Sequence, residues 1–162
     1  MASRARAYRE QAESDLAVFN LLWRAGSVAE ECHALHYLQM ASEKAAKAVL
    51  ATAGVRFGNQ HHSLSFLLGM WKHQRMLPVT RHLGSPPLQV RAMLKAVEAL
   101  CPQIANSRGV GLNAEYPWED PAAPGAWYSP CKQRFRIVLD ANARLTLLEL
   151  IRFLETALRR VR

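Results

Sequence analysis

The chain has 162 residues, half of them hydrophobic and 21% charged, so it can bury one continuous core without disulfides or a structural metal. No apolar run approaches the length of a membrane span and the first nine residues lack a signal-peptide core, so we expect neither a membrane segment nor secretion. Lys and Arg number 21 against 13 Asp and Glu, and the resulting net charge of +8 suits RNA, DNA or an acidic protein as partner, or simply serves solubility.

The first part of the chain predicts two long helices. In residues 4–25, apolar side chains recur at helical spacing, and Gly26 follows where helices commonly end. Ser27 begins a capping-box pattern for the second helix. That helix is rich in alanine and should run to about Thr52, ahead of Gly54.

The middle of the chain predicts a short helix, a loop and another long helix. Ser63 is placed to cap a short, leucine-rich helix. Residues 77–87 contain three prolines and a glycine, which favours a loop. The next helix should begin near Pro86 or Pro87, and Pro102 should kink or interrupt it.

Residues 106–131 break the helical pattern. Four prolines and three glycines exclude one continuous element, and loops this long are functional or packed by their own side chains. The aromatic residues available for such packing are Tyr116, Trp118, Trp127 and Tyr128. A last helix should run from about Gln133 to the end. Since nothing requires a strand, the sequence predicts one all-α domain over residues 1–162, an up-and-down bundle of four long helices plus one short helix.

Few residues suggest catalysis or metal binding on their own. His33 and His36 share a helix face, but no carboxylate or thiol is clearly placed to complete a metal site. Glycine-rich phosphate loops and serine-hydrolase elbows are absent from the sequence. Cys32 and Cys101 fall on apolar stripes, and an odd total of three cysteines favours reduced thiols in a cytoplasmic protein. We expect no metal and no cofactor.

The last helix is rich in arginine. Arg152 and Arg159 are seven residues apart and share a face, which could line a groove for phosphates. Alternatively, this face is only solvated, and its aliphatic stems cover apolar surface. The sequence leaves both interpretations open.

The most specific motif lies on the second helix. It reads Gln39, a small residue, Glu43-Lys44 and then Lys47, and it is followed by Gly54 and by His62-Ser63-Leu64. This order resembles the HEPN domain, a helical family of prokaryotic toxins, defence proteins and nucleotidyltransferase partners. The opening helix, with Ala12, Asp15 and Ala17, and the segment Asn113–Pro117 are also similar to parts of that family. The resemblance implies a helical bundle that forms a homodimer, with a minimal nucleotidyltransferase, RNA or a nucleotide as partner.

The same motif has a physical interpretation that needs no family name. His36, Gln39 and Glu43 form a polar seam on an otherwise apolar helix, and Glu43 can pair with Lys47 four residues on. A buried seam needs hydrogen-bond partners from another helix or subunit. Buttressing of the bundle is the interpretation we favour over catalysis. The candidate contacts for RNA or a nucleotide are Lys44, Lys47, Arg108, Arg152 and Arg159.

Catalytic HEPN proteins are metal-independent RNases that use an arginine, four to six residues and a histidine near the last long helix. Here no histidine follows His82, so Arg108 lacks the implied partner. Arg75 precedes His82 at matching spacing and Arg56 precedes two histidines, but both lie in a different part of the chain. By the same resemblance Tyr116 could hydrogen-bond or be modified. Loss of RNase chemistry is therefore our expectation.

Three hypotheses follow. The first is a non-catalytic or degenerate HEPN protein that dimerises and pairs with a nucleotidyltransferase in a toxin–antitoxin or defence module. The second is an active metal-independent RNase with a rearranged site, using Arg108 and Tyr116, or Arg75 and His82. The third is a basic helical adaptor with no nucleic-acid role.

Overall fold

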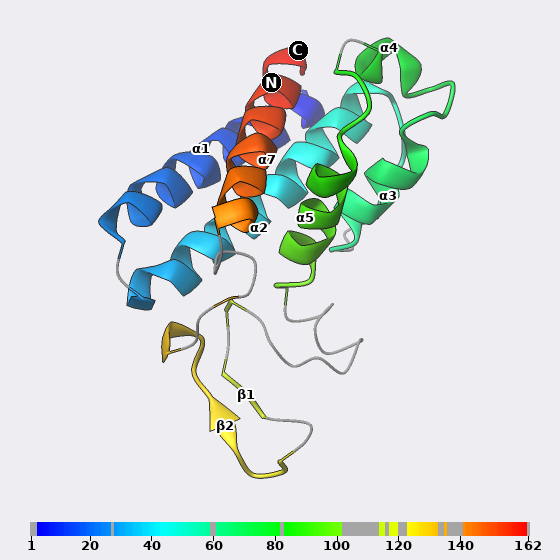
Figure 1. Cartoon of the computed structure of the whole chain (residues 1–162). Helices are drawn as coiled ribbons and strands as arrows, with labels where there is room; N and C mark the ends of the chain where they lie inside the picture. The colour runs from blue at the N-terminus through cyan, green and yellow to red at the C-terminus, as the bar shows by residue number, and fades with distance from the viewer. Residues whose placement is uncertain are drawn as a thin grey trace.

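Two long antiparallel helices, α1 (Arg4–Ala25) and α2 (Val28–Thr52), pack along their length in the computed structural model (Figure 1). The structure describes residues 3–26, 28–58, 61–81, 83–101, 114–115, 117–119, 123–132, 135 and 141–161. The sequence predicted the ends of both helices. Gly26 ends α1 with a left-handed φ of 76°, and Gly54 follows α2 with a φ of 65°, conformations that glycine adopts without steric cost.

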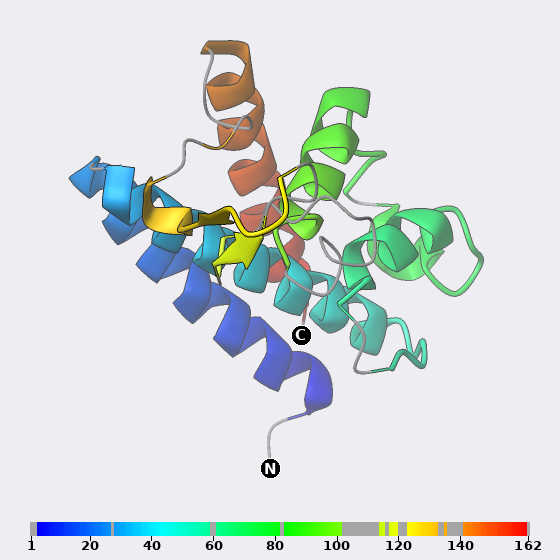
Figure 2. The same cartoon turned by 90° about the horizontal axis from the view of Figure 1, so that it is seen from below.

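Helix α2 lies at the centre of the molecule. It contacts α1 on one side and α3 (Ser63–Met70), α5 (Leu88–Glu98) and α7 (Ala141–Arg160) on the other (Figure 2). The alanines that favoured a helix in the sequence explain how one helix can contact so many others. Four of them are almost fully buried, and their small side chains let neighbouring backbones approach on several faces: Ala41, Ala45, Ala46 and Ala48.

The start of α3 and the loop after it depart from the prediction. Ser63 is the first residue of α3 and not its cap, and His62 holds the cap position without a side-chain hydrogen bond. The cap comes from α5, where Glu98 accepts hydrogen bonds from the backbone N–H and the hydroxyl of Ser65. Within the predicted loop 77–87, one helical turn, α4 (Leu77–Thr80), forms because Pro78 is compatible with a first turn.

The described part of residues 106–131 contains a small hairpin, which the sequence pattern did not indicate and which leaves the all-α class unchanged. Strand β1 (Trp118–Glu119) pairs antiparallel with β2 (Trp127–Tyr128), and the 3₁₀ turn η1 (Pro130–Lys132) follows. The carboxylate of Glu119 on β1 accepts from the backbone N–H of Gly125, two residues before β2, at 2.6 Å. The hairpin lies at the opposite end of the molecule from the two chain termini (Figure 1).

The all-α class is confirmed. The number of long helices stays a prediction, because the expected helix break at Pro102 and the expected start of the last helix near Gln133 lie outside the described residues, as does the cap at Ser27. In the part of the chain that the structure describes, no helix is long and apolar enough to cross a membrane.

Candidate functional site

Glu43 forms the centre of a buried polar cluster on α2. Only 1% of its surface is exposed, and one carboxylate oxygen accepts from the amine of Lys47 at 2.5 Å. The other oxygen lies 2.9 Å from Nδ1 of His61 and accepts from the amide of Gln39 at 3.3 Å. The amine of Lys44 lies 3.5 Å from the first oxygen. We call these five residues the Glu43 cluster.

The partners of Glu43 keep it charged. Burial by itself disfavours the carboxylate and would raise its pKa, but the hydrogen bonds from Lys47 and His61 and the nearby lysine charges outweigh that effect. The pKa of Glu43 is consequently lowered to about 2. A carboxylate that stays ionised and saturated with donors is a poor general acid or base at neutral pH.

The predicted polar seam is only partly realised. Gln39 and Glu43 are joined, as the helical spacing indicated. Among the described residues, no hydrogen bond connects His36 to either of them, and its Nδ1 lies instead 3.9 Å from a carboxylate oxygen of Glu115. Sequence reasoning missed the role of His61, because its contact with Glu43 spans 18 residues and depends on how the turn after α2 folds back.

Aromatic residues extend the Glu43 cluster toward the start of α1. The amine of Lys47 lies 5.9 Å from the ring centroid of Tyr8, and that ring packs against Phe57 at 5.8 Å. The guanidinium of Arg4 lies over the Phe57 ring at 4.5 Å, within the range of a cation–π contact. Lys47, predicted to contact RNA, is therefore buried between Glu43 and Tyr8, whereas Lys44 is partly exposed.

A pocket opens next to this aromatic group. It has a volume of about 420 Å³ and lies between the turn after α2 and the first turns of α3. Its wall consists of two charged or titratable side chains, two serines and two phenylalanines around a glycine: Arg56, His62, Ser63, Ser65, Phe57, Phe66 and Gly58. We call this the Arg56 pocket.

Of the four residues predicted for RNase chemistry, the structure describes only Arg75. His82, Arg108 and Tyr116 lie outside the described residues. Arg75 is exposed in the segment between α3 and α4, and its backbone N–H donates to the ring of His73. The pairing of Arg75 with His82 stays a prediction.

The two arginines predicted to line a phosphate groove are exposed on α7. Arg159 borders a pocket of about 320 Å³ between α1 and α7 and donates to the hydroxyl of Thr156 at 3.0 Å. Arg152 lies two turns earlier on the same helix and is not among the residues that line that pocket. The same pocket is bordered by Glu13 and Glu155, which lowers its attraction for phosphates.

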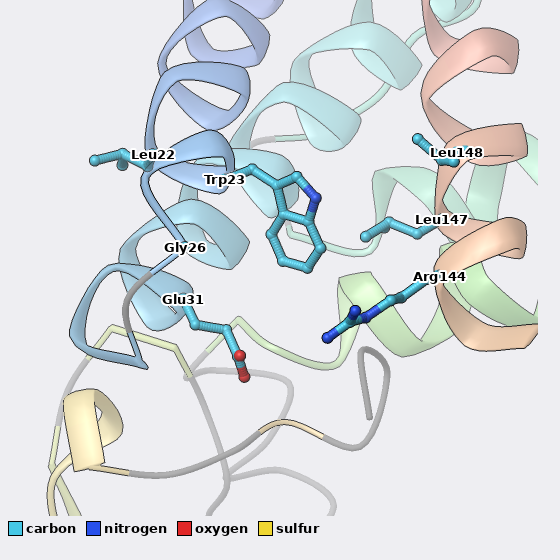
Figure 3. A pocket seen from close by; sticks show the side chains of 7 residues that line it. All are labelled: Leu22, Trp23, Gly26, Glu31, Arg144, Leu147 and Leu148. Atoms are coloured by element: carbon cyan, nitrogen blue, oxygen red, sulfur yellow. The ribbon is translucent and has the colours of Figure 1, made fainter. Parts of the chain in front are cut away.

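A further pocket of about 410 Å³ lies between the end of α1 and the start of α7. Trp23, Leu147 and Arg144 point toward it, and Glu31 approaches from α2 (Figure 3). One carboxylate oxygen of Glu31 already accepts from the backbone N–H of Phe135 at 3.1 Å. Glu31 therefore links Phe135 to α2, and the pocket combines the apolar side chains of Trp23 and Leu147 with the charged Arg144 and Glu31.

Among the described residues, the buried cysteines show no sign of a reactive thiolate, and the possible metal ligands do not form a metal site. Cys32 and Cys101 are buried, as their apolar stripes predicted, and burial raises the pKa of the Cys32 thiol, which disfavours a reactive thiolate. Within the described ranges, no group of three or more His, Cys, Asp or Glu side chains could hold a metal ion.

Comparison with known families agrees with the resemblance drawn from the Gln39–Lys47 block. A family model described as the HEPN domain matches residues 5–101, which is more than half of the chain and includes α1, α2 and the Arg56 pocket. Comparisons with curated proteins and with solved structures find no significant match. The HEPN family includes toxin, defence and RNase-like proteins, and this chain belongs to that family.

Proposed function

We propose that this chain is a non-catalytic HEPN protein that acts by binding, as a homodimer paired with a small nucleotidyltransferase in a toxin–antitoxin or defence module. The observation that carries this proposal is the Glu43 cluster. The ionisable groups of the family motif are saturated by one another, and Glu43 is held charged with a pKa of about 2. Such a cluster stabilises the pairing of α2 with its neighbours, and its central carboxylate, Glu43, is not poised for acid–base chemistry in RNA cleavage.

The sequence supports the same conclusion. No histidine follows His82, so the region where the family's catalytic histidine is expected has only Arg108. An arginine can stabilise charge on a phosphate but cannot exchange protons near neutral pH. An RNase would need another acid–base group to replace the histidine.

A binding protein needs surface for its partner, and the hairpin offers some. Trp127 is 66% exposed at the end of the molecule away from the chain termini. Tryptophan is enriched at protein interfaces because it buries a large apolar area with few rotatable bonds. We therefore place the partner contact on the hairpin, with Trp127 as its anchor.

The first test is RNA cleavage by the purified chain in EDTA, with Arg108→Ala, His82→Ala and Arg75→Ala alongside. We expect no cleavage from any of these proteins while all remain folded. Cleavage by the wild type that one substitution abolishes would overturn the non-catalytic proposal and identify the site.

The second test is capture of partners from the native host, with Trp127→Ser compared with Leu88→Ser. Leu88 is 79% exposed on α5 and serves as the matched control. We expect a nucleotidyltransferase to be enriched by the wild type and by the Leu88 variant but not by the Trp127 variant. Light scattering measures the dimer separately. A monomer that captures no nucleotidyltransferase and binds no RNA would favour the adaptor hypothesis instead.

A further inference from the structure

We propose that Cys32 and Cys131 form a peroxide-sensitive thiol pair, which closes to an intramolecular disulfide on oxidation and fastens η1 to α2. This inference goes beyond the proposed binding function and does not depend on it, because the two thiols react with peroxide whatever partner the chain binds. Both cysteines are thiols in this structure. Thiol pairs of this kind stay reduced in a reducing compartment and oxidise only transiently, which is typical of redox sensors.

The fold places the two cysteines on elements that pack together. Cys32 lies in the second turn of α2 and Cys131 lies in η1, and α-carbons of these two elements come within 8 Å of one another. Both views of the fold show η1 beside the first turns of α2 (Figure 1 and Figure 2). A disulfide needs α-carbons about 4–7 Å apart, so this packing distance is one that a short turn can close.

A second contact beside the cysteines holds the same part of the chain against α2. Glu31 precedes Cys32, and its carboxylate accepts from the backbone N–H of Phe135, 104 residues away, at 3.1 Å. Pro130 and Phe135 are buried, and Cys131 packs against the hydrophobic core that includes Cys32. The two thiols therefore belong to one packed region at the start of α2.

The environments of the two thiols assign them different steps. Cys32 is 1% exposed, and its pKa is raised by burial and, to a smaller extent, by the negative charge of a nearby Cys131 thiolate. Cys32 is therefore a poor first target for peroxide. Cys131 is partly exposed, and its sulfur lies 3.1 Å from the hydroxyl of Ser129, which can donate to a thiolate. Cys131 is thus the thiol that meets peroxide, and Cys32 is the thiol that resolves the product.

The reaction consumes one hydrogen peroxide and releases two waters. The Cys131 thiolate attacks one peroxide oxygen, the O–O bond breaks, and the departing hydroxide takes up a proton, which leaves a sulfenic acid on Cys131. The sulfur of Cys32 then attacks the sulfur of Cys131. The S–S bond forms, the S–O bond breaks, and the hydroxide leaves as water with the thiol proton of Cys32. The two thiols are oxidised by two electrons, and the peroxide is reduced by the same two.

The bridge changes how the hairpin is attached to the bundle. η1 follows β2 after one residue, and β2 carries the exposed Trp127. A covalent link from Cys131 to α2 restricts the opening of this segment away from the helices, because the turn can no longer separate from α2 without breaking the bond. Reduction of the disulfide by a thiol restores the open segment.

The experiment is a titration of the purified, reduced chain with hydrogen peroxide, followed by alkylation of the remaining thiols and mass spectrometry of the peptides. Dimedone, which reacts with sulfenic acids, is added in parallel samples. The variants are Cys32→Ala and Cys131→Ala. Cys101→Ala is the matched control, because Cys101 is a buried cysteine that does not contribute to the raised pKa of Cys32. Circular dichroism establishes that each variant is folded.

We expect the wild type and the Cys101 variant to lose two hydrogen atoms per chain and to yield peptides joined through Cys32 and Cys131. In Cys32→Ala, dimedone should label Cys131 about tenfold more than in the wild type, because no thiol resolves the sulfenic acid. In Cys131→Ala, neither the label nor a disulfide should form at the same peroxide concentration. Amide hydrogen exchange in residues 129–132 should slow about tenfold or more after oxidation of the wild type, and a reductant should reverse this.

Oxidation of wild-type Cys131 to a sulfinic acid, or its labelling by dimedone, with no bridge to Cys32 would overturn the inference. So would a bridge that joins two chains on a non-reducing gel, or one that includes Cys101. An unchanged exchange rate in residues 129–132 after bridging would overturn the fastening of η1 to α2. These measurements involve neither RNA nor a partner protein. Failure of the thiol pair therefore leaves the proposed binding function in place, and the reverse also holds.

Discussion

Charged residues occupy two contrasting regions of this molecule, the Glu43 cluster on α2 and the outer face of α7. In the cluster, Glu43 is 1% exposed and receives donors from Lys47, His61 and Gln39. On α7, Arg152 and Arg159 are exposed, and the guanidinium of Arg159 donates only one turn away, to the hydroxyl of Thr156. The sequence marked charged residues of both helices as candidates for binding RNA or a nucleotide.

The contrast shows that burial, and not residue type, decides whether a charged side chain contributes to stability or to binding. A buried charge must be matched within the protein, so it contributes to stability and is withdrawn from binding. An exposed charge contributes little to stability and remains available to a partner, with strength that falls as salt increases. The sequence groups Lys47 and Arg159 together as candidate binding residues, and the structure separates them on this basis.

The largest expected effect comes from Glu43→Gln. Removal of one member of a buried ion pair leaves Lys47 without its counter-charge, and we expect the free energy of unfolding to fall by about 3–5 kcal/mol. Urea denaturation followed by circular dichroism measures the change. Glu10→Gln is the control, since its pair with Arg6 is half exposed and should cost less than about 1 kcal/mol. Equal losses in the two variants would remove the distinction between buried and exposed charge.

The second effect is the response to acid. Because the pKa of Glu43 is about 2 in the folded chain against an ordinary 4.5, the unfolded chain takes up this proton first as the pH falls. The stabilisation, of the order of 3 kcal/mol, is complete above pH 4.5 and is lost as the pH approaches 2. Urea titrations of wild type and Glu43→Gln at pH 6, 4 and 3 isolate this contribution. Stability curves that stay parallel across that range would contradict it.

Replacement of Glu98 should lower the free energy of unfolding less than replacement of Glu43 does. Glu98 is also a buried carboxylate, but its hydrogen-bond donors are neutral. Both of its oxygens accept from Ser65, which attaches α3 to α5. In Glu98→Gln, the amide oxygen can still accept one hydrogen bond from Ser65, but the amide NH₂ faces the other donor of Ser65. We therefore expect the free energy of unfolding to fall by about 1–3 kcal/mol. Ser65→Ala serves as the partner in a double-mutant cycle, and coupling near zero would show that the two residues do not act together.

The smallest effect on stability is expected on α7. Arg152→Gln combined with Arg159→Gln should change the free energy of unfolding by less than about 0.5 kcal/mol. If this face binds RNA, a plot of the log binding constant against log salt concentration should be less steep for the double variant than for the wild type. The magnitude of its slope should be smaller by about two, because two phosphates would no longer be neutralised by arginine. Filter binding at several salt concentrations measures the slope. An unchanged slope would assign the two arginines to solvation alone.

Much of the fold could be predicted because its signals are local. Gly26 and Gly54 mark helix ends within the chain itself, and the alanines of α2 predict both a helix and close packing. The cap of α3 could not be predicted, because Glu98 acts from 33 residues away. The turn α4 escapes prediction because Pro78 reads as a helix breaker, although proline is compatible with the first turn of a helix.

The candidate site divides in the same way. The pairing of Glu43 with Lys47 follows from four-residue spacing on one helix, and the sequence predicted it. The contact of His61 with Glu43 depends on the path of a turn, which periodicity does not encode. His36 shares a helix face with Gln39 but faces Glu115, because the segment before the hairpin supplies a carboxylate there.

The environments of the tryptophans have a practical consequence. Trp71 is buried, its indole N–H donates to the carbonyl of Gly84 at 3.1 Å, and it packs against Phe153. Trp127 is largely exposed on the hairpin. The chain has four tryptophans, so the two environments are separated in a variant with Trp23→Phe and Trp118→Phe. Its fluorescence carries a blue-shifted emission from Trp71 that reports unfolding and a red-shifted emission from Trp127, open to iodide quenching, that reports occupancy of the hairpin. Both processes can be followed in one cuvette without an attached dye.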